Sequence, residues 1–379
     1  MRLLKKLNPG IFKMKYYIIA GEPSGDMYGS RLIQEIIKTN PNSKIRFWGG
    51  ELMKKSGGKL VKHYKDLAFM GFLEVLKNIF KILKNLSFCK EDILGFKPDK
   101  IIFIDYPGFN LRIAKWAKRK KFDTYFYISP QVWAWKENRV KSIKKYIDQM
   151  YVILPFEKSF YEKKHNFKVH YYGHPLLNII DKTISSKNNK ILTKSDKPIV
   201  AILPGSRKQE IDSILNKILK VVKDFKDYQF IIAGVNHLNK KTYQDVIKRN
   251  NVSVSVVYNK TYELLINSEA AIVTSGTATL ETALIGTPQI VCYTTNSFNM
   301  FLAKLFVKIN FISLVNLILN KETVKELIQS DVNKKNIKKE LKLILTSRKN
   351  QIKKDYKRLR KLLQGNKIEK KIVNHIINN

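Results

Sequence analysis

The strongest constraint on the fold is the alternation of short apolar runs with longer helical stretches along both halves of the chain. In the first half the apolar, β-rich runs are Tyr16–Ala20, Lys44–Trp48, Lys100–Ile104, Thr124–Ile128 and Gln149–Leu154. In the second half they are Ile199–Leu203, Gln229–Ala233, Val252–Val257, Ala271–Thr274 and Gln289–Tyr293. Strands that alternate with helices are typical of parallel sheets covered by helices. The sequence therefore predicts an α/β chain with two Rossmann-like domains whose parallel sheets face each other across a cleft.

The 379 residues suit two domains of ordinary size, and the polar run Asp181–Lys197 is the expected junction. We expect an N-terminal extension at 1–14, a first domain at 15–180 and a second at 181–331. The lysine-rich remainder, 332–379, predicts C-terminal helices that either pack back on the first domain or form a solvated basic segment.

The net charge of the chain indicates an anionic partner but does not identify it. The chain has 71 Lys and Arg against 31 Asp and Glu, a formal charge of +40, which favours nucleic acid or anionic lipid alike. The sequence contains no run of 18 apolar residues, so no membrane span is expected, and residues 1–14 lack the apolar centre of a signal peptide. Cys89 and Cys292 have no metal-binding or redox spacing, which indicates a reduced, cytosolic setting.

Three motifs follow strands of the first half. In the first, Glu22, Ser24, Gly25 and Asp26 precede a helix expected at Met27–Thr39, either as an anion site or as a tight turn capped by Ser24 or Asp26. In the second, Asp105 ends a strand and is either a general base or a helix cap. In the third, Ser129–Trp135 supplies Trp133, which either walls a pocket or belongs to the core, and His174 follows at a later strand end.

Two motifs of the second half predict a phosphate site. Gly205, Ser206 and Arg207 combine a flexible backbone with a guanidinium that matches phosphate oxygens. Ser275, Gly276 and Thr277 open a helix whose first N–H groups can bind a diphosphate, and Glu281 can accept hydrogen bonds from a ribose. A capped helix explains either motif alone, but explains less well why both occur in one half.

The stretch Leu67–Phe88 predicts an amphipathic helix that is either an ordinary core helix or a membrane contact. Its apolar side would hold Phe69, Phe72, Leu73, Leu76, Ile79, Phe80, Leu83 and Leu86. Its polar side would hold Glu74, Lys77, Lys81, Lys84 and Asn85.

In their order along the chain these motifs resemble those of the lipid-A-disaccharide synthase family. The matching segments run from Ala20–Asp26 through Ile104–Asn110, Ser129–Trp135 and Leu203–Arg207 to Ser275–Glu281, and they cover roughly 15–331. The chain departs from the family where Gly108 replaces a second acid, and at Pro23, Val315 and Asn320.

The resemblance implies a GT-B fold and an inverting, metal-independent glycosyl transfer that needs no cofactor. The donor would be UDP-2,3-diacylglucosamine and the acceptor 2,3-diacylglucosamine 1-phosphate, on the inner face of the cytoplasmic membrane of a Gram-negative-type bacterium. Asp105 would match the family's essential aspartate, Arg207 its arginine, and Asn316 an asparagine near the donor. The oligomeric state is left open between monomer and homodimer.

Two alternatives remain from the sequence. One is another GT-B glycosyltransferase or a UDP-sugar epimerase, against which the Ser129–Trp135 motif argues. The other is a nucleic-acid-binding protein, suggested by charge alone and without a recognition module.

Overall fold

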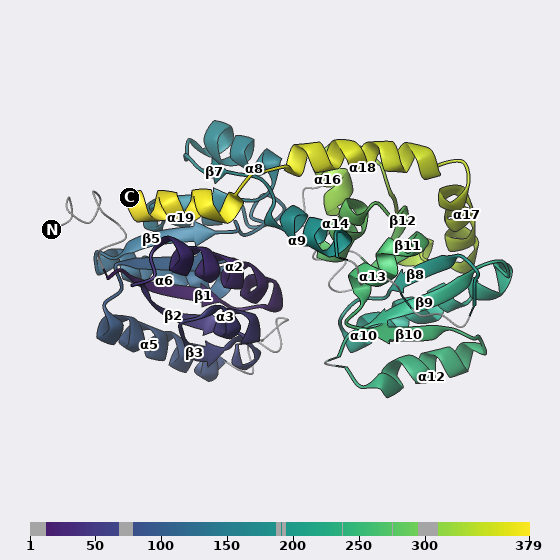
Figure 1. Cartoon of the computed structure of the whole chain (residues 1–379), viewed down its shortest axis with the longest axis horizontal. Helices are drawn as coiled ribbons and strands as arrows, with labels where there is room; N and C mark the ends of the chain where they lie inside the picture. The colour runs from purple at the N-terminus through teal and green to yellow at the C-terminus, as the bar shows by residue number, and fades with distance from the viewer. Residues whose placement is uncertain are drawn as a thin grey trace. The chain divides into compact units, whose positions relative to one another are not determined.

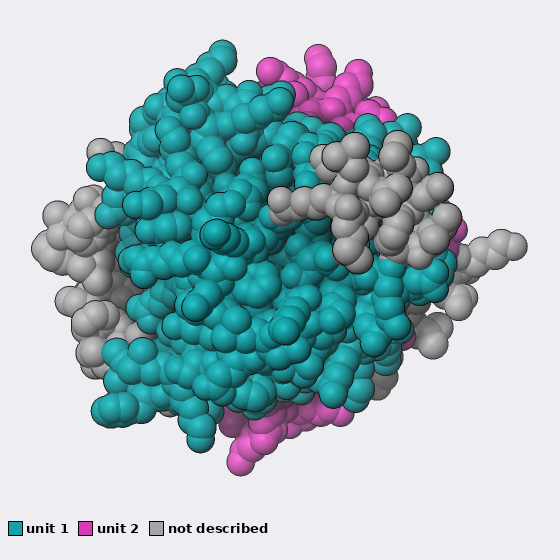
Figure 2. Space-filling model, turned by 90° about the vertical axis from the view of Figure 1, so that its left-hand side faces the viewer, with its two compact units in different colours: residues 1–175, 365–379 teal, residues 176–364 magenta. Residues whose placement is uncertain are grey.

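The computed structural model describes residues 13–67, 79–186, 191, 195–236, 238–274, 276–294 and 310–379. The chain forms two compact units, which Figure 2 colours separately. Unit 1 comprises Met1–Pro175 and Gly365–Asn379, and unit 2 comprises Leu176–Gln364. The chain therefore passes from one unit to the other at Pro175, five residues before the junction expected from the sequence, and returns at Gly365.

Unit 1 is built on a parallel sheet of seven strands in the order β3-β2-β1-β4-β5-β6-β7 (Figure 1). The strands are β1 Lys15–Ala20, β2 Lys44–Gly49, β3 Lys59–His63, β4 Lys100–Ile104, β5 Asp123–Tyr127, β6 Gln149–Val152 and β7 His170–Tyr171. Alternate residues of β1 face opposite sides of the sheet, so its apolar run is buried on both faces. Tyr17 and Ile19 pack in one core cluster with α5 (Ile79–Phe96), α6 (Pro107–Arg119) and α7 (Arg139–Tyr146), while α2 (Pro23–Thr39) packs on β1.

Unit 2 repeats the design with six parallel strands in the order β10-β9-β8-β11-β12-β13. They are β8 Ile199–Leu203, β9 Gln229–Gly234, β10 Ser255–Tyr258, β11 Ser268–Thr274, β12 Gln289–Tyr293 and β13 Lys325–Ile328. Its helices include α9 (Pro175–Ile184), which begins at the junction, α12 (Lys240–Asn250), α13 (Thr261–Ile266), α14 (Thr277–Ile285) and α16 (Leu314–Leu319). Both units thus have the Rossmann strand order that the alternating pattern predicts.

The sequence did not reveal three strands, β3, β7 and β13. Each lies at the edge of its sheet, and β3 and β13 contain lysines whose side chains need solvent on one side. β7 has only two residues, too few for a periodic pattern. An edge strand pairs with a neighbour on one side only and is partly exposed, so its hydrophobicity alone does not identify it in a sequence.

The C-terminal helices divide between the units. α17 (Lys334–Leu345) packs on β11 and β12, and α18 (Lys349–Leu363) packs on α14, all within unit 2. Only α19 (Ile368–Asn378) returns to unit 1, where it lies along α2 and Glu369 pairs with Arg31 (Figure 1). The expectation that the whole segment 332–379 packs on the first domain therefore holds for its last helix alone.

No helix in the described part of the chain is both long enough and apolar enough to span a bilayer.

Candidate active site

Each sheet has one point where successive connections leave in opposite directions, and part of the predicted site lies there: Glu22 and Asp105 in unit 1, and Arg207 and Gly276 in unit 2. In unit 1 this point lies between β1 and β4, where Ala20 pairs with Ile104 and both strands end. In unit 2 it lies between β8 and β11, where Leu203 pairs with Val273. In open parallel sheets, ligands bind just beyond the carboxyl ends of the strands at such a point. The two units thus each present one candidate half-site.

Asp105 stands directly after β4 in an uncommon backbone conformation. Asp105 and Tyr106 are both left-handed, with φ of 44° and 51°, which is costly for residues other than glycine. The turn is held by Asn110, whose amide donates to the carbonyl oxygens of Asp105 at 2.7 Å and of Ile19 and Ile104 at 3.3 Å. The Tyr106 ring covers Gly21, where a Cβ would approach a ring carbon to 2.3 Å. These contacts therefore fix the backbone of the turn that carries Asp105.

The environment of Asp105 suits a general base. Burial, helped by the nearby charge of Glu22, raises the pKa of Asp105 to about 7, and a hydrogen bond from the backbone of Tyr106 opposes this rise only in part. A base is most effective when its pKa lies near the working pH. Glu22, predicted as a site residue of the first motif and placed just before α2, thus acts on Asp105 through its charge. The helix-cap alternative for Asp105 loses support, since no capping bond from a side chain is made at the start of α6.

The first motif is mostly structural. The helix begins at Pro23, four residues earlier than predicted, so Ser24, Gly25 and Asp26 lie inside its first turns. Asp26 is buried, and its carboxylate accepts hydrogen bonds from the N–H groups of Gly50, Leu52 and Met53 at 2.7–3.1 Å, at the start of α3 (Glu51–Ser56). The structure gives Asp26 this capping role in place of the predicted cleft role, because the carboxylate is already saturated by donors.

The tryptophan loop after β5 is anchored by Trp133 and exposes Trp135. The indole of Trp133 donates to Glu157 at 3.3 Å and packs edge-on against Phe156. Glu157 is fully buried, which raises its pKa to about 7 although the N–H groups of Ile153 and Leu154 also donate to it. Trp133, predicted as a cleft residue, thus holds the loop to α8 (Pro155–Ser159), and the accessible indole belongs to Trp135, which is 46% exposed.

His174 is buried where the chain leaves unit 1. Burial lowers its pKa to about 3, so the imidazole is neutral at any working pH. It follows Gly173, whose φ is 108°, and precedes the first residue of α9. A neutral, enclosed imidazole cannot offer positive charge to a phosphate.

In unit 2, the loop Pro204–Arg207 is folded around Glu210. The Glu210 carboxylate accepts from the N–H groups of Ser206 at 3.2 Å and Arg207 at 3.3 Å, and lies 3.3 Å from the Arg207 guanidinium. Gly205 has φ of 100°, and a Cβ there would approach Glu210 to 2.4 Å. The backbone donors predicted for phosphate are therefore engaged internally, while the Arg207 side chain is 64% exposed and remains accessible. The three-residue spacing of Arg207 and Glu210 was the signal that the sequence analysis missed.

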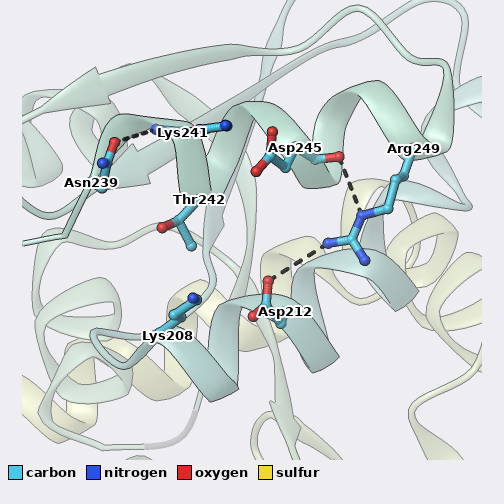
Figure 3. A pocket seen from close by; sticks show the side chains of 7 residues that line it. All are labelled: Lys208, Asp212, Asn239, Lys241, Thr242, Asp245 and Arg249. Carbon is cyan, nitrogen blue, oxygen red and sulfur yellow. Dashed lines mark hydrogen bonds and ion pairs between the residues drawn. The ribbon is translucent and has the colours of Figure 1, made fainter.

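A polar pocket of about 330 Å³ lies in unit 2, between the helical segment that starts at Lys208 and α12 (Figure 3). Its lining residues are Lys208, Asp212, Asn239, Lys241, Thr242, Asp245 and Arg249. Figure 3 shows Arg249 directed at Asp212, 3.6 Å away, and at the backbone oxygen of Asp245. Three cations against two carboxylates leave one excess positive charge on the surface next to Arg207.

The second loop of unit 2 leads into α14. Gly276 has φ of 134°, and a Cβ there would meet no atom within 4 Å, so the backbone at the helix start is open. Thr277 is exposed at the first position of α14, and Ser275 lies outside the described residues. Glu281, one turn on, accepts a hydrogen bond of 2.6 Å from the Tyr262 hydroxyl, and burial raises its pKa. An open helix N-terminus next to a guanidinium loop suits a diphosphate.

Asn316 has a structural role that replaces the predicted donor contact. It is fully buried and its amide donates to the Val324 oxygen and to Glu326, both at 2.8 Å. Its oxygen accepts from the N–H groups of Thr323 and Val324 at 2.8 and 3.0 Å. All four of its strong hydrogen-bonding positions are used, so none is left for a ligand. Asn320 ends α16 in the left-handed conformation, with φ of 51°, which asparagine tolerates.

The predicted membrane helix is described only from Ile79 onward, and Phe69, Phe72, Leu73, Leu76 and Lys77 lie outside the described residues. Phe80 is 83% exposed and Leu83 51%, with Lys81 and Lys84 beside them. Asn85, predicted on the polar side, is buried, so this position was predicted wrongly. Leu86, predicted on the apolar side, is buried as well, together with Cys89 and Ile93. The buried residues of α5 recur every three or four positions and form the face that packs on α6. The exposed apolar side of the helix is therefore narrower than predicted.

Replacing Asn316 with alanine should destabilise unit 2 and leave UDP binding unchanged. The variant leaves buried backbone groups of residues 323 and 324 unpaired, at a cost of about 2–4 kcal/mol. Urea denaturation measures the loss, and calorimetric titration with UDP below the unfolding midpoint measures affinity. Asn320→Gly, an exposed neighbour in a glycine-compatible conformation, is the control and should change little. Weaker UDP binding at undiminished stability would show that Asn316 contacts the donor.

Comparison with known proteins finds relatives along nearly the whole chain. The family model described as lipid-A-disaccharide synthetase matches residues 16–377. Lipid-A-disaccharide synthase of Syntrophus aciditrophicus (strain SB) is 37% identical over 336 residues, 86% of this chain and 87% of that protein. The protein of the same name from Coxiella burnetii (strain Dugway 5J108-111) is 36% identical over 338 residues, 87% of this chain and 88% of its own length.

Among solved structures, the chain is similar to UDP-GlcNAc 2-epimerase from Neisseria meningitidis bound to UDP-GlcNAc, with a TM-score of 0.68 over 97% of this chain and all of that one at 14% identity. It is also similar to the glycotransferase of kitacinnamycin, with a TM-score of 0.63 at 9% identity over 96% of this chain and 98% of that one. These likenesses show the shared GT-B fold and no more. The sequence relatives carry the assignment further: this chain belongs to the lipid-A-disaccharide synthetase family, whose members are glycosyltransferases.

Proposed function

We propose that the chain joins two acylated glucosamines. It transfers 2,3-diacylglucosamine from UDP-2,3-diacylglucosamine to the 6-hydroxyl of 2,3-diacylglucosamine 1-phosphate, which forms a β-1,6-linked disaccharide and releases UDP. Membership of the family over nearly the whole chain carries this proposal. The half-sites of the two units support it, since one offers a base and the other offers groups for an anionic leaving group.

Asp105 acts as the general base in unit 1. Its carboxylate takes the proton of the acceptor hydroxyl as that oxygen attacks the anomeric carbon of the donor, and the bond to the UDP oxygen breaks. A pKa near 7 makes this carboxylate a stronger base than an exposed aspartate. Gly108, in place of a second acid, leaves Asp105 to do this work alone.

Unit 2 holds the UDP. The exposed guanidinium of Arg207 and the N–H groups at the start of α14 neutralise the charge that develops on the diphosphate. Glu281, fixed by Tyr262, accepts hydrogen bonds from the ribose hydroxyls. Glu210 is a positioning residue, because it fixes the backbone that carries Arg207.

The enzyme works as a peripheral protein on the inner face of the cytoplasmic membrane, where acylated substrates reside. Of the large apolar side chains that are exposed in the described residues, the largest exposed fraction belongs to Phe80 at the start of α5. Phe80 and Leu83 enter the interface, and Lys81 and Lys84 approach anionic headgroups at roughly 1 kcal/mol each.

Purified protein given both substrates should form disaccharide and UDP in equal amounts, and Asp105→Asn should lower turnover by about a hundredfold or more while keeping UDP affinity. Since the base must be ionised, kcat/KM should rise with pH through about 7 and then level off. Glu22→Gln removes the neighbouring charge, lowers the pKa of Asp105 and should move this limb to lower pH. Rate profiles measured by UDP release check both, and an unshifted limb in Glu22→Gln would contradict the assignment.

Arg207→Ala and Glu281→Gln should weaken the donor side in different ways. Loss of Arg207 removes charge stabilisation and should lower both kcat and UDP affinity, each by about tenfold or more. Loss of the Glu281 charge should act mainly on affinity. Calorimetry with UDP and steady-state kinetics separate the two effects, and Lys241→Gln serves as a nearby charge control. Unchanged UDP affinity in both variants would place the donor elsewhere.

Phe80→Ser with Leu83→Ser should reduce binding to vesicles that contain anionic lipid and reduce turnover of long-chain substrates. Turnover of short-chain, soluble analogues should persist, because the chemical site is untouched. Leu94→Ser, 44% exposed on the same helix but about 20 Å further along, is the matched control. Equal vesicle binding by all variants would exclude this end of α5 as the membrane contact.

A further inference from the structure

Two cations lie over Trp135 in unit 1 and a third lies near one of them, and none of the three has a carboxylate partner in the described residues. The Lys136 Nζ lies 4.3 Å, and the Arg139 guanidinium carbon 5.8 Å, from the centre of the Trp135 ring. Arg112, on α6, is close enough that its charge adds to burial in lowering the pKa of Arg139. In the same way burial and the charge of Arg139 lower the pKa of Lys136. Like charges held together in this way favour an anion between them.

The described residues offer no internal anion to this cluster. None of the three side chains makes an ion pair or hydrogen bond within the described ranges. The one carboxylate on the loop and α7, Glu137, is turned to Lys164 at 2.6 Å and His165 at 2.9 Å. This differs from the polar pocket of unit 2, where Arg249 already has Asp212.

The cluster lies near the proposed base. Tyr127, the last residue of β5, pairs with Ile104, and the loop that carries Trp135 starts from there. Arg112 lies on α6, five residues and about 7–8 Å along the helix from Pro107, and α6 begins two residues after Asp105. Gly108 lies on the same side of α6 as Arg112, four residues before it, and a Cβ there would meet no atom within 4 Å. The surface of α6 between its start and Arg112 is therefore open at Gly108.

We propose that Lys136 and Arg139, which lie over Trp135, together with the nearby Arg112 bind the phosphate monoester of the acceptor and so orient its 6-hydroxyl towards Asp105. This assignment rests on the proposed function, which supplies an acceptor with a phosphate at one end and the attacking hydroxyl at the other. Guanidinium and ammonium groups are the donors that suit a phosphate dianion. The exposed indole of Trp135 offers an apolar face to the sugar ring.

The kinetic test compares acceptors with and without the 1-phosphate. Wild-type enzyme should prefer the phosphorylated acceptor, and Lys136→Gln with Arg139→Gln should raise KM for it by about tenfold or more while KM for the UDP donor stays the same. The same pair should hardly affect the acceptor that lacks phosphate. Arg139→Lys should restore part of the preference, whereas Lys141→Gln, an exposed lysine two residues further on, should not alter it. Variants that keep the full preference would overturn the proposal.

Two binding experiments identify the source of the phosphate that the cations bind. Calorimetry with glucosamine 1-phosphate against glucosamine measures recognition of the phosphate without turnover, so it separates a failure of this site from a failure of the proposed function. Binding to vesicles of phosphatidylglycerol and phosphatidylcholine tests a lipid headgroup as the source of the phosphate. Loss of vesicle binding with unchanged preference for glucosamine 1-phosphate would overturn the acceptor assignment in favour of the membrane.

Discussion

The candidate site of unit 1 depends on a single buried amide. Asn110 reaches back from α6 and donates to carbonyl oxygens at the ends of both β1 and β4. These strands diverge at this point, so no ladder bond continues beyond them, and the amide supplies the missing donor. The same contact fixes the left-handed turn at Asp105 and Tyr106, whose backbone cost must be repaid by its surroundings. Without Asn110 the proposed base would have no fixed direction.

Four acidic residues lie where backbone N–H groups need an acceptor. Asp26 serves the start of α3, Glu157 the loop before α8, Glu210 the loop of Arg207, and Glu326 the N–H groups of residues 312 and 313. Each is an internal anion at the end of a strand or at the start of a helix, where donors are unpaired. The cations around Trp135 stand out because they have no such partner in the described ranges.

The proposed base also has a thermodynamic consequence. Because the folded-state pKa of Asp105 is raised to about 7, the folded chain holds this proton more tightly than the unfolded chain does. Its contribution to stability is therefore present at low pH and is lost as pH rises from about 4 through about 7. The fold thus disfavours the ionised form of Asp105, which is the form that would take the substrate proton. Functional sites often carry such a cost in stability.

The sequence by itself determined the two parallel sheets, since buried parallel strands must be apolar on both faces and such runs stand out between helices. It also placed Asp105, Arg207 and Gly276 just after strands, because each motif comes directly after an apolar run that predicts a strand. Tertiary structure alone decided which polar groups are available to a ligand. Asp26, Asn316 and Trp133 looked like site residues, but partners distant in sequence or across a loop occupy them. Arg112 did not stand out in the sequence, and Glu22 stood out only as part of the first motif. Folding brought each beside another charge, and electrostatic coupling depends on distance in space, which a linear pattern does not contain.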